Sequence, residues 1–373
     1  MDFSFDQEQQ AVSDLAAQIL EGLLGHDALK EHEASGEPYP AKVWEELAKA
    51  GLTGIALPAE HGGAGLGFTA ACLVLEQVGR TTAPVPYLAT VVLGALPVAR
   101  FGTDAQQADL LPGVADGSVV LTVALHEDGT TPGRPTVQAR PDGEGWRVSG
   151  TKSMVPFGLQ ASRILVPARA GEGEVVVLLV DPAADGVSQE ALETTSGLPE
   201  TLLVMDDVAV DVGGVLAGPD QGAEVVDWMV QHATAAMCAT AAGVCAEALS
   251  LTAEYTKTRE QFDRPIATFQ AVGQRAADAY IDTEAVRLTA WQAVWRLSEG
   301  LPAAEQVAVA KFWTAEGGQR VVHAAQHLHG GMGVDRDYPL HRYFLWAKQL
   351  ELTLGGGTRS LLDLGDHLAD TPL

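Results

Sequence analysis

The feature that most constrains the fold is a change of pattern in the middle of the chain. Between about residues 118 and 218 the sequence breaks into short runs rich in β-branched residues, such as 119–123 and 175–180, separated by turn residues. On either side of this region, apolar residues recur at helical spacing instead. The pattern therefore predicts helical regions at both ends of the chain and a small antiparallel β-barrel or sandwich between them.

We divide the chain accordingly into an N-terminal helical domain of residues 1–117, a central β-domain of residues 118–218 and a C-terminal helical bundle of residues 219–373. Residues 224–258 are rich in alanine and contain Gly243 as their only glycine, and such small side chains let helices pack closely. Two further runs, 283–298 and 303–329, predict two more long helices.

The charge and the cysteines limit the class of protein. The chain carries 49 acidic and 23 basic side chains, a net charge of −26, which opposes binding to nucleic acid or to an anionic membrane surface. Its three cysteines, Cys72, Cys238 and Cys245, form no CxxC pair and fit a reducing compartment. Residues 1–6 lack the features of a signal peptide, and we identify no uncharged apolar run long enough to span a bilayer. We expect a cytoplasmic protein.

Three local motifs follow one another along the chain. Residues 51–63 form a glycine-rich loop, and residues 259–270 read Arg-Glu-Gln-Phe-Asp-Arg-Pro-Ile-Ala-Thr-Phe-Gln. Residues 329–333 read His-Gly-Gly-Met-Gly and are followed by Asp-Tyr-Pro-Leu at 337–340. In this order the three motifs resemble the PExxGGxG loop, the RxQFGxPIxxFQ signature and the HGGxG segment of acyl-CoA dehydrogenases.

The resemblance implies the acyl-CoA dehydrogenase fold, with a helical domain, a β-domain and a C-terminal four-helix bundle. Such proteins usually form tetramers that are dimers of dimers. The resemblance also implies FAD as cofactor, an acyl-CoA as substrate and electron-transfer flavoprotein as electron acceptor. FAD would lie between the β-domain and the bundle, and its adenosine diphosphate end would reach a neighbouring subunit.

The same resemblance assigns candidate cofactor-binding residues. Arg259 would supply positive charge to the pyrophosphate, and Gln261 and Phe262 would flank that group. Taken alone, Arg259 is better interpreted as a solvated cation at a helix end, and it is the twelve-residue motif of residues 259–270 that favours the flavin role. Gly330 and Gly331 would let backbone N–H groups approach the cofactor. The remaining predicted cofactor-binding residues are Gln270, Gln326 and His327. We predict no metal site.

The catalytic base of the family has no counterpart in this sequence. Dehydrogenation needs a carboxylate to take the α-proton while the β-hydrogen leaves as hydride to flavin N5. In many members that carboxylate is the Glu of a YEGT-like segment, which here reads Leu-Gly-Gly-Gly-Thr at 354–358, with Gly356 at the Glu position. In other members it lies about ten residues before the glycine that is here Gly243, at Ala233. The catalytic residue is therefore left unassigned.

The predicted β-domain also departs from the family pattern. The usual T-E-x-x-G-S-D stretch reads Ala-Leu-His-Glu-Asp-Gly at 124–129. In the usual K-x-W-I-T-N segment, Met154 replaces the Trp that packs on the flavin, and Pro156 replaces the Thr that bonds to N5. Proline offers neither a hydroxyl nor an N–H. His327 replaces the Gln that usually stands two residues before the HGG, with Gln326 adjacent.

These losses affect the chain's own flavin face and base, whereas the 259–270 motif that reaches the neighbour's cofactor is retained. This combination resembles the partner subunits of the heterotetrameric (α2β2) acyl-CoA dehydrogenases of bacterial steroid degradation. It predicts a FAD-dependent α,β-desaturation of an acyl-CoA in a hetero-oligomer whose partner supplies the catalytic Glu.

Three alternatives remain open. The first is a competent homotetramer with a displaced base, for which the candidates are Glu224, Asp227, Glu351 and His232. A second is a monooxygenase or lyase on the same fold, and a third is a flavin-free structural subunit.

Overall fold

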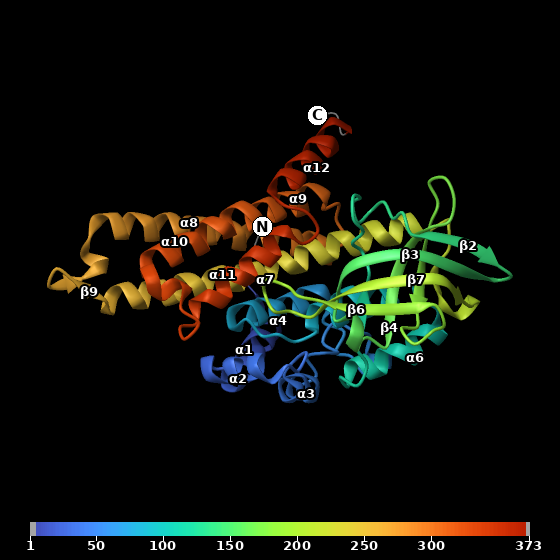
Figure 1. Ribbon diagram of the computed structural model, residues 1–373, viewed down its shortest axis with the longest axis horizontal. Helices are drawn as coiled ribbons and strands as arrows, with labels where there is room; N and C mark the ends of the chain where they lie inside the picture. The colour runs from blue at the N-terminus through green and yellow to red at the C-terminus, as the bar shows by residue number, and fades with distance from the viewer. Residues whose placement is uncertain (1–4, 371–373) are drawn as a thin grey trace. The chain divides into compact units, whose positions relative to one another are not determined.

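The computed structural model describes residues 5–370, and within this range helices occupy both ends of the chain and strands the middle (Figure 1). Residues 1–4, which contribute to the prediction that there is no signal peptide, lie outside the described residues. The predicted order of helices, strands and helices is confirmed. The chain folds into two compact units, one of residues 1–35, 72–83 and 234–373 and one of residues 36–71 and 84–233. The three-domain division at residues 117 and 218 stays a prediction.

The first unit is helical. Two long helices, α7 (Gly222–Thr258, which begins in the other unit) and α8 (Gln270–Ser298), run through it. Its further helices are α1 (Gln7–Leu23), α2 (His26–Ser35), α9 (Ala304–Phe312), the π-helix η6 (Trp313–Gly317), α10 (Gly318–His329), α11 (Leu340–Leu352) and α12 (Gly357–Asp370).

Two glycines let α7 pack closely against α4 (Gly67–Thr81). A Cβ atom at Gly243 would lie 1.9 Å from the Glu76 carbonyl oxygen, and one at Gly79 would lie 2.0 Å from the Thr240 carbonyl oxygen. No side chain fits at such distances, so the only glycine of the alanine-rich run stands where two helix backbones meet. The expected close packing of small side chains is confirmed at this crossing.

One of the three predicted long helices begins earlier than expected. The run 224–258 corresponds to α7, and the run 303–329 corresponds to α9, η6 and α10. The run 283–298 is only the second half of α8, which begins at Gln270. Most of residues 270–282 are exposed, so this half of the helix has too little apolar periodicity to be recognised from the sequence.

Helix α7 corrects a second expectation. It is long and apolar enough to cross a membrane by length and composition, although no such run was predicted. Within the protein, 72% of its most apolar window is buried. Burial to this extent is typical of a core helix, which passes the same test of length and hydropathy.

The second unit combines short helices with a sheet. Its helices include α3 (Ala41–Lys49), the π-helix η2 (Leu88–Ala95), α5 (Leu96–Phe101) and α6 (Asp104–Ala115). Its strands are β1 (Leu121–Val123), β2 (Gln138–Asp142), β3 (Gly145–Pro156), β4 (Arg163–Arg169), β5 (Val175–Val180), β6 (Val187–Leu192), β7 (Glu200–Val210) and β8 (Val215–Ala217).

The strands form one sheet in the order β6-β7-β3-β2-β4-β5-β8, with β1 beside β4. Most neighbours are antiparallel, as predicted, but β4 pairs in parallel with both β1 and β2. The β2–β3 hairpin lies between β1 and β4 along the chain, and β1 and β2 pair with opposite ends of the same strand, β4. Alternate residues of the strands, including Val148, Ile164, Leu178 and Leu203, are buried in one core.

Candidate functional site

The motif of residues 259–270 is the connection between the two longest helices (Figure 1). Within it, β9 (Glu260–Gln261) pairs antiparallel with β10 (Arg264–Pro265). The two turn residues, Phe262 and Asp263, have φ angles of +55° and +60°, as a two-residue type I′ hairpin turn requires. A 3-10 turn, η5 (Ile266–Thr268), then leads into α8. The motif is therefore an ordered hairpin.

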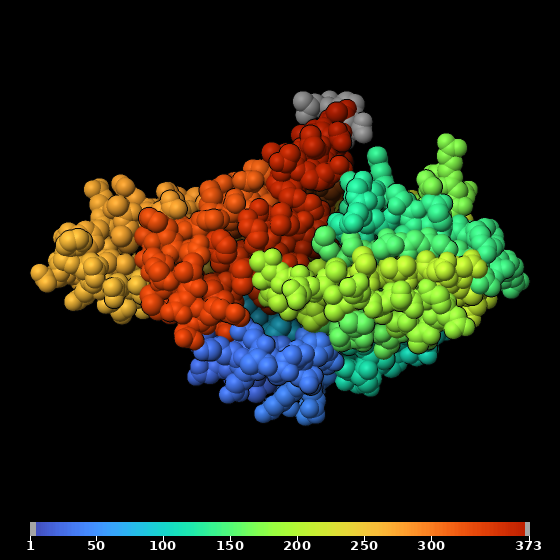
Figure 2. Space-filling view, in the orientation of Figure 1, coloured from blue at the N-terminus to red at the C-terminus, as the bar shows by residue number. Residues whose placement is uncertain are grey.

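The side chains of this hairpin lie at the protein surface, seen in light orange in Figure 2. Phe262 is 87% exposed and contacts Phe269 edge-on, with ring centroids 6.1 Å apart. The Arg264 guanidinium lies over the Phe269 ring, 4.1 Å from its centroid. Arg259 is exposed and has no ion pair within the described part of the chain. The Arg259 guanidinium and the Phe262 ring are both exposed and therefore available to a group from outside this chain.

The second predicted cofactor segment begins at the buried His329. Its Nδ1 donates to the Ala325 carbonyl at 2.8 Å, and its Nε2 lies 3.1 Å from the Tyr338 hydroxyl. Burial lowers the pKa of His329. The His329 ring stacks on Tyr255 with centroids 4.3 Å apart, and the Tyr255 carbonyl accepts the backbone N–H of Arg259. Tyr255 thus joins the two predicted cofactor segments.

The second segment carries three glycines in η7 (Gly330–Val334), and the structure constrains only two of them. Gly330 has a φ of +58°, which favours glycine. A Cβ atom at Gly333 would lie 2.8 Å from the Gln326 carbonyl oxygen. Gly331 has neither constraint, since a Cβ there would meet no described atom within 4 Å. The open space at Gly330 and Gly331 permits the predicted approach of a ligand to the backbone.

The structure places the remaining predicted residues on the same two segments. Gln270 is exposed at the first position of α8. His327 is exposed and Gln326 is half-buried, both in the last turns of α10. Their assignment to the cofactor stays a prediction.

In the second unit, the segment of residues 124–129 is held to β3 by a buried ion pair. Lys152 Nζ lies 2.5 Å from Glu127 Oε1, and the two side chains are 0% and 4% exposed. The other carboxylate oxygen accepts the backbone N–H groups of Thr136 and Val137 at 2.8 and 3.0 Å. Burial raises the pKa of Glu127, but Lys152 and these donors outweigh it and hold that pKa below its usual range. Burial lowers the pKa of Lys152.

The two residues predicted to replace flavin contacts follow Lys152 on β3. Met154 stands in a bulge of β3 with a φ of +51° and is 45% exposed. Pro156 ends the strand. The Ser153 hydroxyl lies 2.7 Å from His126 Nδ1 and 3.1 Å from Asp128 Oδ1. Position 156 therefore has no hydroxyl or N–H to offer a flavin.

Neither usual position of the base holds a carboxylate. Gly356 lies between α11 and α12, and a Cβ there would meet only the Glu351 carbonyl oxygen, at 3.9 Å. A side chain would therefore fit at this position. Ala233 is fully buried on α7.

The alternative bases have other surroundings. His232 Nδ1 donates to the Trp228 carbonyl at 2.9 Å, and the two rings stack with centroids 3.7 Å apart. Burial lowers the pKa of His232 to about 4, so its imidazole is a weak proton acceptor. Glu351 forms an ion pair with Lys348 at 2.5 Å. The two remaining candidates are exposed near the start of α7, Glu224 and Asp227.

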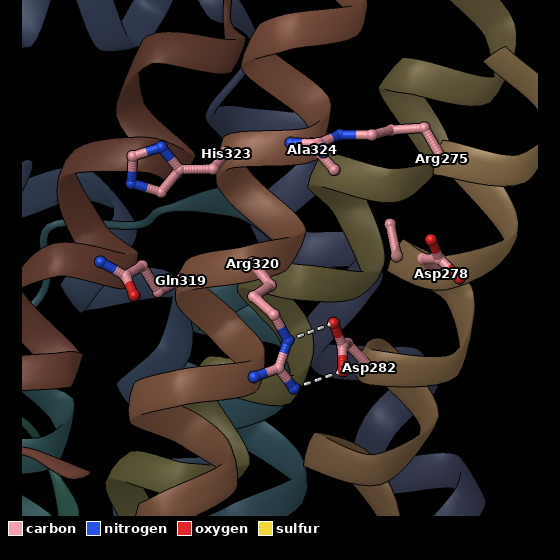
Figure 3. Close-up of a pocket in the computed structure, with 8 residues that line it drawn as sticks. Arg275, Asp278, Asp282, Gln319, Arg320, His323 and Ala324 are labelled. Carbon is pink, nitrogen blue, oxygen red and sulfur yellow. Dashed lines mark hydrogen bonds and ion pairs between the residues drawn. The ribbon is translucent and has the colours of Figure 1, made fainter. Parts of the chain in front are cut away.

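A polar pocket of about 390 Å³ lies between α8 and α10 (Figure 3). Arg320 donates two hydrogen bonds to Asp282 there, at 2.6 and 2.8 Å. Arg275 and His323 also line it. The pocket is lined by other residues than the eight predicted to bind cofactor.

The Lys152–Glu127 pair was missed in the sequence, although a signal was present. Val148 and Lys152 are four residues apart on one strand, so both side chains point to the same face of the sheet. Because Val148 faces the core, Lys152 must do so too and needs a buried partner. The sequence does not show which carboxylate that partner is.

Comparisons with known proteins cover both ends of the chain. Family models described as acyl-CoA dehydrogenase, N-terminal domain, and acyl-CoA dehydrogenase, C-terminal domain, match residues 6–118 and 220–364. The acyl-CoA dehydrogenase FadE27 of Mycobacterium tuberculosis (strain ATCC 25618 / H37Rv) is 40% identical over 100% of both chains. Among solved structures, the ChsE4-ChsE5 complex from Mycobacterium tuberculosis has a TM-score of 0.94 at 41% identity over 100% of both chains. A variant of the Tcur3481-Tcur3483 steroid ACAD has a TM-score of 0.91 at 46% identity over 98% of both chains.

Proposed function

Since the chain belongs to the acyl-CoA dehydrogenase family, we propose that it is one subunit of a hetero-oligomeric, FAD-dependent acyl-CoA dehydrogenase. The enzyme desaturates an acyl-CoA thioester between its α and β carbons, as an oxidoreductase acting on CH–CH. In this proposal the partner chain supplies the catalytic Glu.

One observation supports the proposal above the others, namely the contrast between the two sets of cofactor residues. The hairpin of residues 259–270 presents an unpaired guanidinium and an exposed ring to whatever lies outside this chain. On the chain's own flavin face, Pro156 offers no donor, and Gly356 and Ala233 offer no carboxylate. A chain that serves a neighbour's site but not its own is expected to show this pattern.

The chemistry of the first set fits the diphosphate of FAD. A guanidinium can donate two parallel hydrogen bonds to phosphate oxygens. The backbone at Gly330 and Gly331 has open space on its Cβ side, and because the Gly330 N–H already donates to the His327 carbonyl, that space is what this segment offers to a ligand. Arg259, Gln261, Phe262, Gln270, Gln326 and His327 would complete this half of the site. FAD, when bound, supplies the hydride acceptor. Among the described residues of the second unit, Met154 and Pro156 do not provide equivalent contacts.

The substrate class and the partners follow from the same relatives. Two similar structures are described as a complex of two chains and as a steroid ACAD. We therefore place this chain in lipid or steroid catabolism, as half of a tetramer with two copies of each chain, with electron-transfer flavoprotein as the electron acceptor. Gly356 would then make room for a bulky acyl group. We also propose a cytoplasmic location.

Co-expression tests the proposal directly. The chain is purified alone and together with a second acyl-CoA dehydrogenase chain that carries a Glu at the position of Gly356 or Ala233, and subunit ratio and FAD content are measured. We expect a complex with equal numbers of both chains that retains FAD and oxidises an acyl-CoA. A complex that forms but binds no FAD would contradict the assignment of the 259–270 hairpin.

A further inference from the structure

Lys311, near the end of α9, is a charged side chain in the core of the helical unit. It is 3% exposed, and it has no carboxylate partner at ion-pair distance within the described residues. Burial lowers the pKa of Lys311 to about 8, so most of the population still carries the charge at neutral pH. An ammonium group is retained in a core only where its donors are satisfied.

Those donors meet the carboxyl end of another helix. Lys311 Nζ lies 2.5 Å from the Leu350 carbonyl oxygen and 3.1 Å from the Glu351 carbonyl oxygen. Both carbonyls belong to the last turn of α11, where the helix leaves carbonyls without an intrahelical donor and carries the negative end of its dipole. Lys311 is therefore a cap that α9 provides for α11.

The end of α11 leads directly into the loop that contains Gly356. The backbone of this loop, residues 353–356, is unusual, because Leu354 has a φ of +58° and Gly355 one of +102°. Such conformations persist only where neighbouring groups hold them. Glu316 of η6 lies close to the residue that follows the loop, since a Cβ atom at Gly357 would lie 2.7 Å from its carboxylate. The α9–η6 segment thus lies against the residues that flank the loop on both sides.

We propose that Lys311 is a positioning residue for the acyl-CoA site: its ammonium group holds the end of α11 and thereby fixes the loop in which Gly356 replaces the family's base. This inference rests on the proposed function for the meaning of the loop, but not for the contact itself. It predicts that the loop loosens when Lys311 loses its charge, because the neutral amine no longer complements the helix dipole.

The other titratable groups near Lys311 are Cys238 on α7 and Glu351 on α11. Burial raises the pKa of the Cys238 thiol, so this group stays neutral near pH 8. Glu351 is held in its ion pair with Lys348. A change in the amide exchange of the loop around pH 8 is therefore attributed to the titration of Lys311.

Hydrogen–deuterium exchange of the full chain tests the contact without cofactor or partner. In Lys311→Met, we expect amides of residues 353–360 to exchange at least about tenfold faster, as the loss of charge-assisted hydrogen bonds implies. Amides of the 259–270 hairpin should not change. Lys348→Met, which removes the ammonium group of a partly exposed ion pair on α11, is the matched control and should leave the loop protected. Equal protection in Lys311→Met and wild type would overturn the inference.

Two further readouts keep the inference testable if Lys311→Met does not fold. In the wild-type chain, loop exchange corrected for its intrinsic pH dependence should accelerate as pH rises through about 8, and an unchanged rate would contradict the proposal. In the co-expressed complex, Lys311→Gln should raise KM for an acyl-CoA about tenfold while FAD content stays the same. Loss of FAD would instead count against the proposed function and not against the role of Lys311. The two failures are therefore distinguishable.

Discussion

The ammonium group of Lys152 and the carboxylate of Glu127 lie 2.5 Å apart inside the sheet unit, where neither side chain is more than 4% exposed. Removal of one partner leaves the other charge buried without compensation. We expect Lys152→Met to lower the free energy of unfolding by about 3–5 kcal/mol, measured by urea denaturation. The exposed pair of Lys257 and Glu254 provides the control, and Lys257→Met should cost at most about 1 kcal/mol. An equal decrease in the free energy of unfolding for the two variants would contradict a stabilising role of the buried Lys152–Glu127 pair.

The same pair sets a limit to acid stability. The pKa of Glu127 is lowered in the folded protein relative to the ordinary value of 4.5. Its contribution to the free energy of unfolding is therefore complete above pH 4.5 and is lost as pH falls through the folded-state pKa. Denaturation followed from neutral to acidic pH should show this loss in wild type. A double variant, Glu127→Leu with Lys152→Met, should lack it.

His232 provides a second, separate pH dependence. Burial lowers its pKa from 6.5 to about 4, so between these values the unfolded chain binds a proton that the folded chain does not. The free energy of unfolding should fall by up to about 3 kcal/mol as pH drops from 6.5 to 4, and the contribution is constant above 6.5. His232→Phe should remove this slope. His323→Phe, at an exposed histidine of α10, should leave the pH dependence of the free energy of unfolding unchanged. If this pH dependence persists in His232→Phe, His232 is not its cause.

Arg259 should govern FAD affinity in the complex with the partner chain. Loss of its charge-assisted hydrogen bonds should weaken FAD binding roughly 10–100-fold in Arg259→Ala. The measurement is a fluorescence titration of the apo-complex with FAD. Arg275 is an exposed arginine outside the hairpin, on the wall of the α8–α10 pocket (Figure 3), and Arg275→Ala should bind FAD as wild type does. If both variants bind FAD equally well, Arg259 has no such role.

Introducing a carboxylate at position 356 tests whether the missing base is the only cause of inactivity in the isolated chain. A Cβ at this position has room, so Gly356→Glu should fold with a change of less than about 1 kcal/mol. Gly355→Ala should cost about 1–3 kcal/mol, because its φ of +102° is strained for any side chain. The isolated Gly356→Glu chain should still fail to oxidise an acyl-CoA, since Pro156 remains at the flavin face. Turnover by this variant would show that the base alone is lacking.

Sequence periodicity predicted the order of helices and strands because most elements bury one face. It failed where burial is not periodic: the first half of α8 is exposed on most sides, and its residues were not recognised as helical. The parallel pairing of β1 with β4 was not predictable either, since the direction of a pairing depends on the path of the intervening hairpin rather than on the strand's own residues.

For the candidate site, motif resemblance predicted two cofactor segments, but it could not show that Tyr255 joins them through His329. It also identified Gly356 and Ala233 as residues without a carboxylate. The contacts of Lys311 and Lys152 were missed because a lysine in the sequence reads as a surface residue. Only the packing of distant segments shows what a buried ammonium group meets.

The most direct test of the account is the anaerobic reduction of flavin by an acyl-CoA, followed by visible absorption. The chain alone, supplied with equimolar FAD, is compared with the same chain in complex with a partner that carries the catalytic Glu. We predict that the flavin is bleached only in the complex. Stoichiometric bleaching by the isolated chain would contradict the conclusion that this subunit depends on a partner for its chemistry.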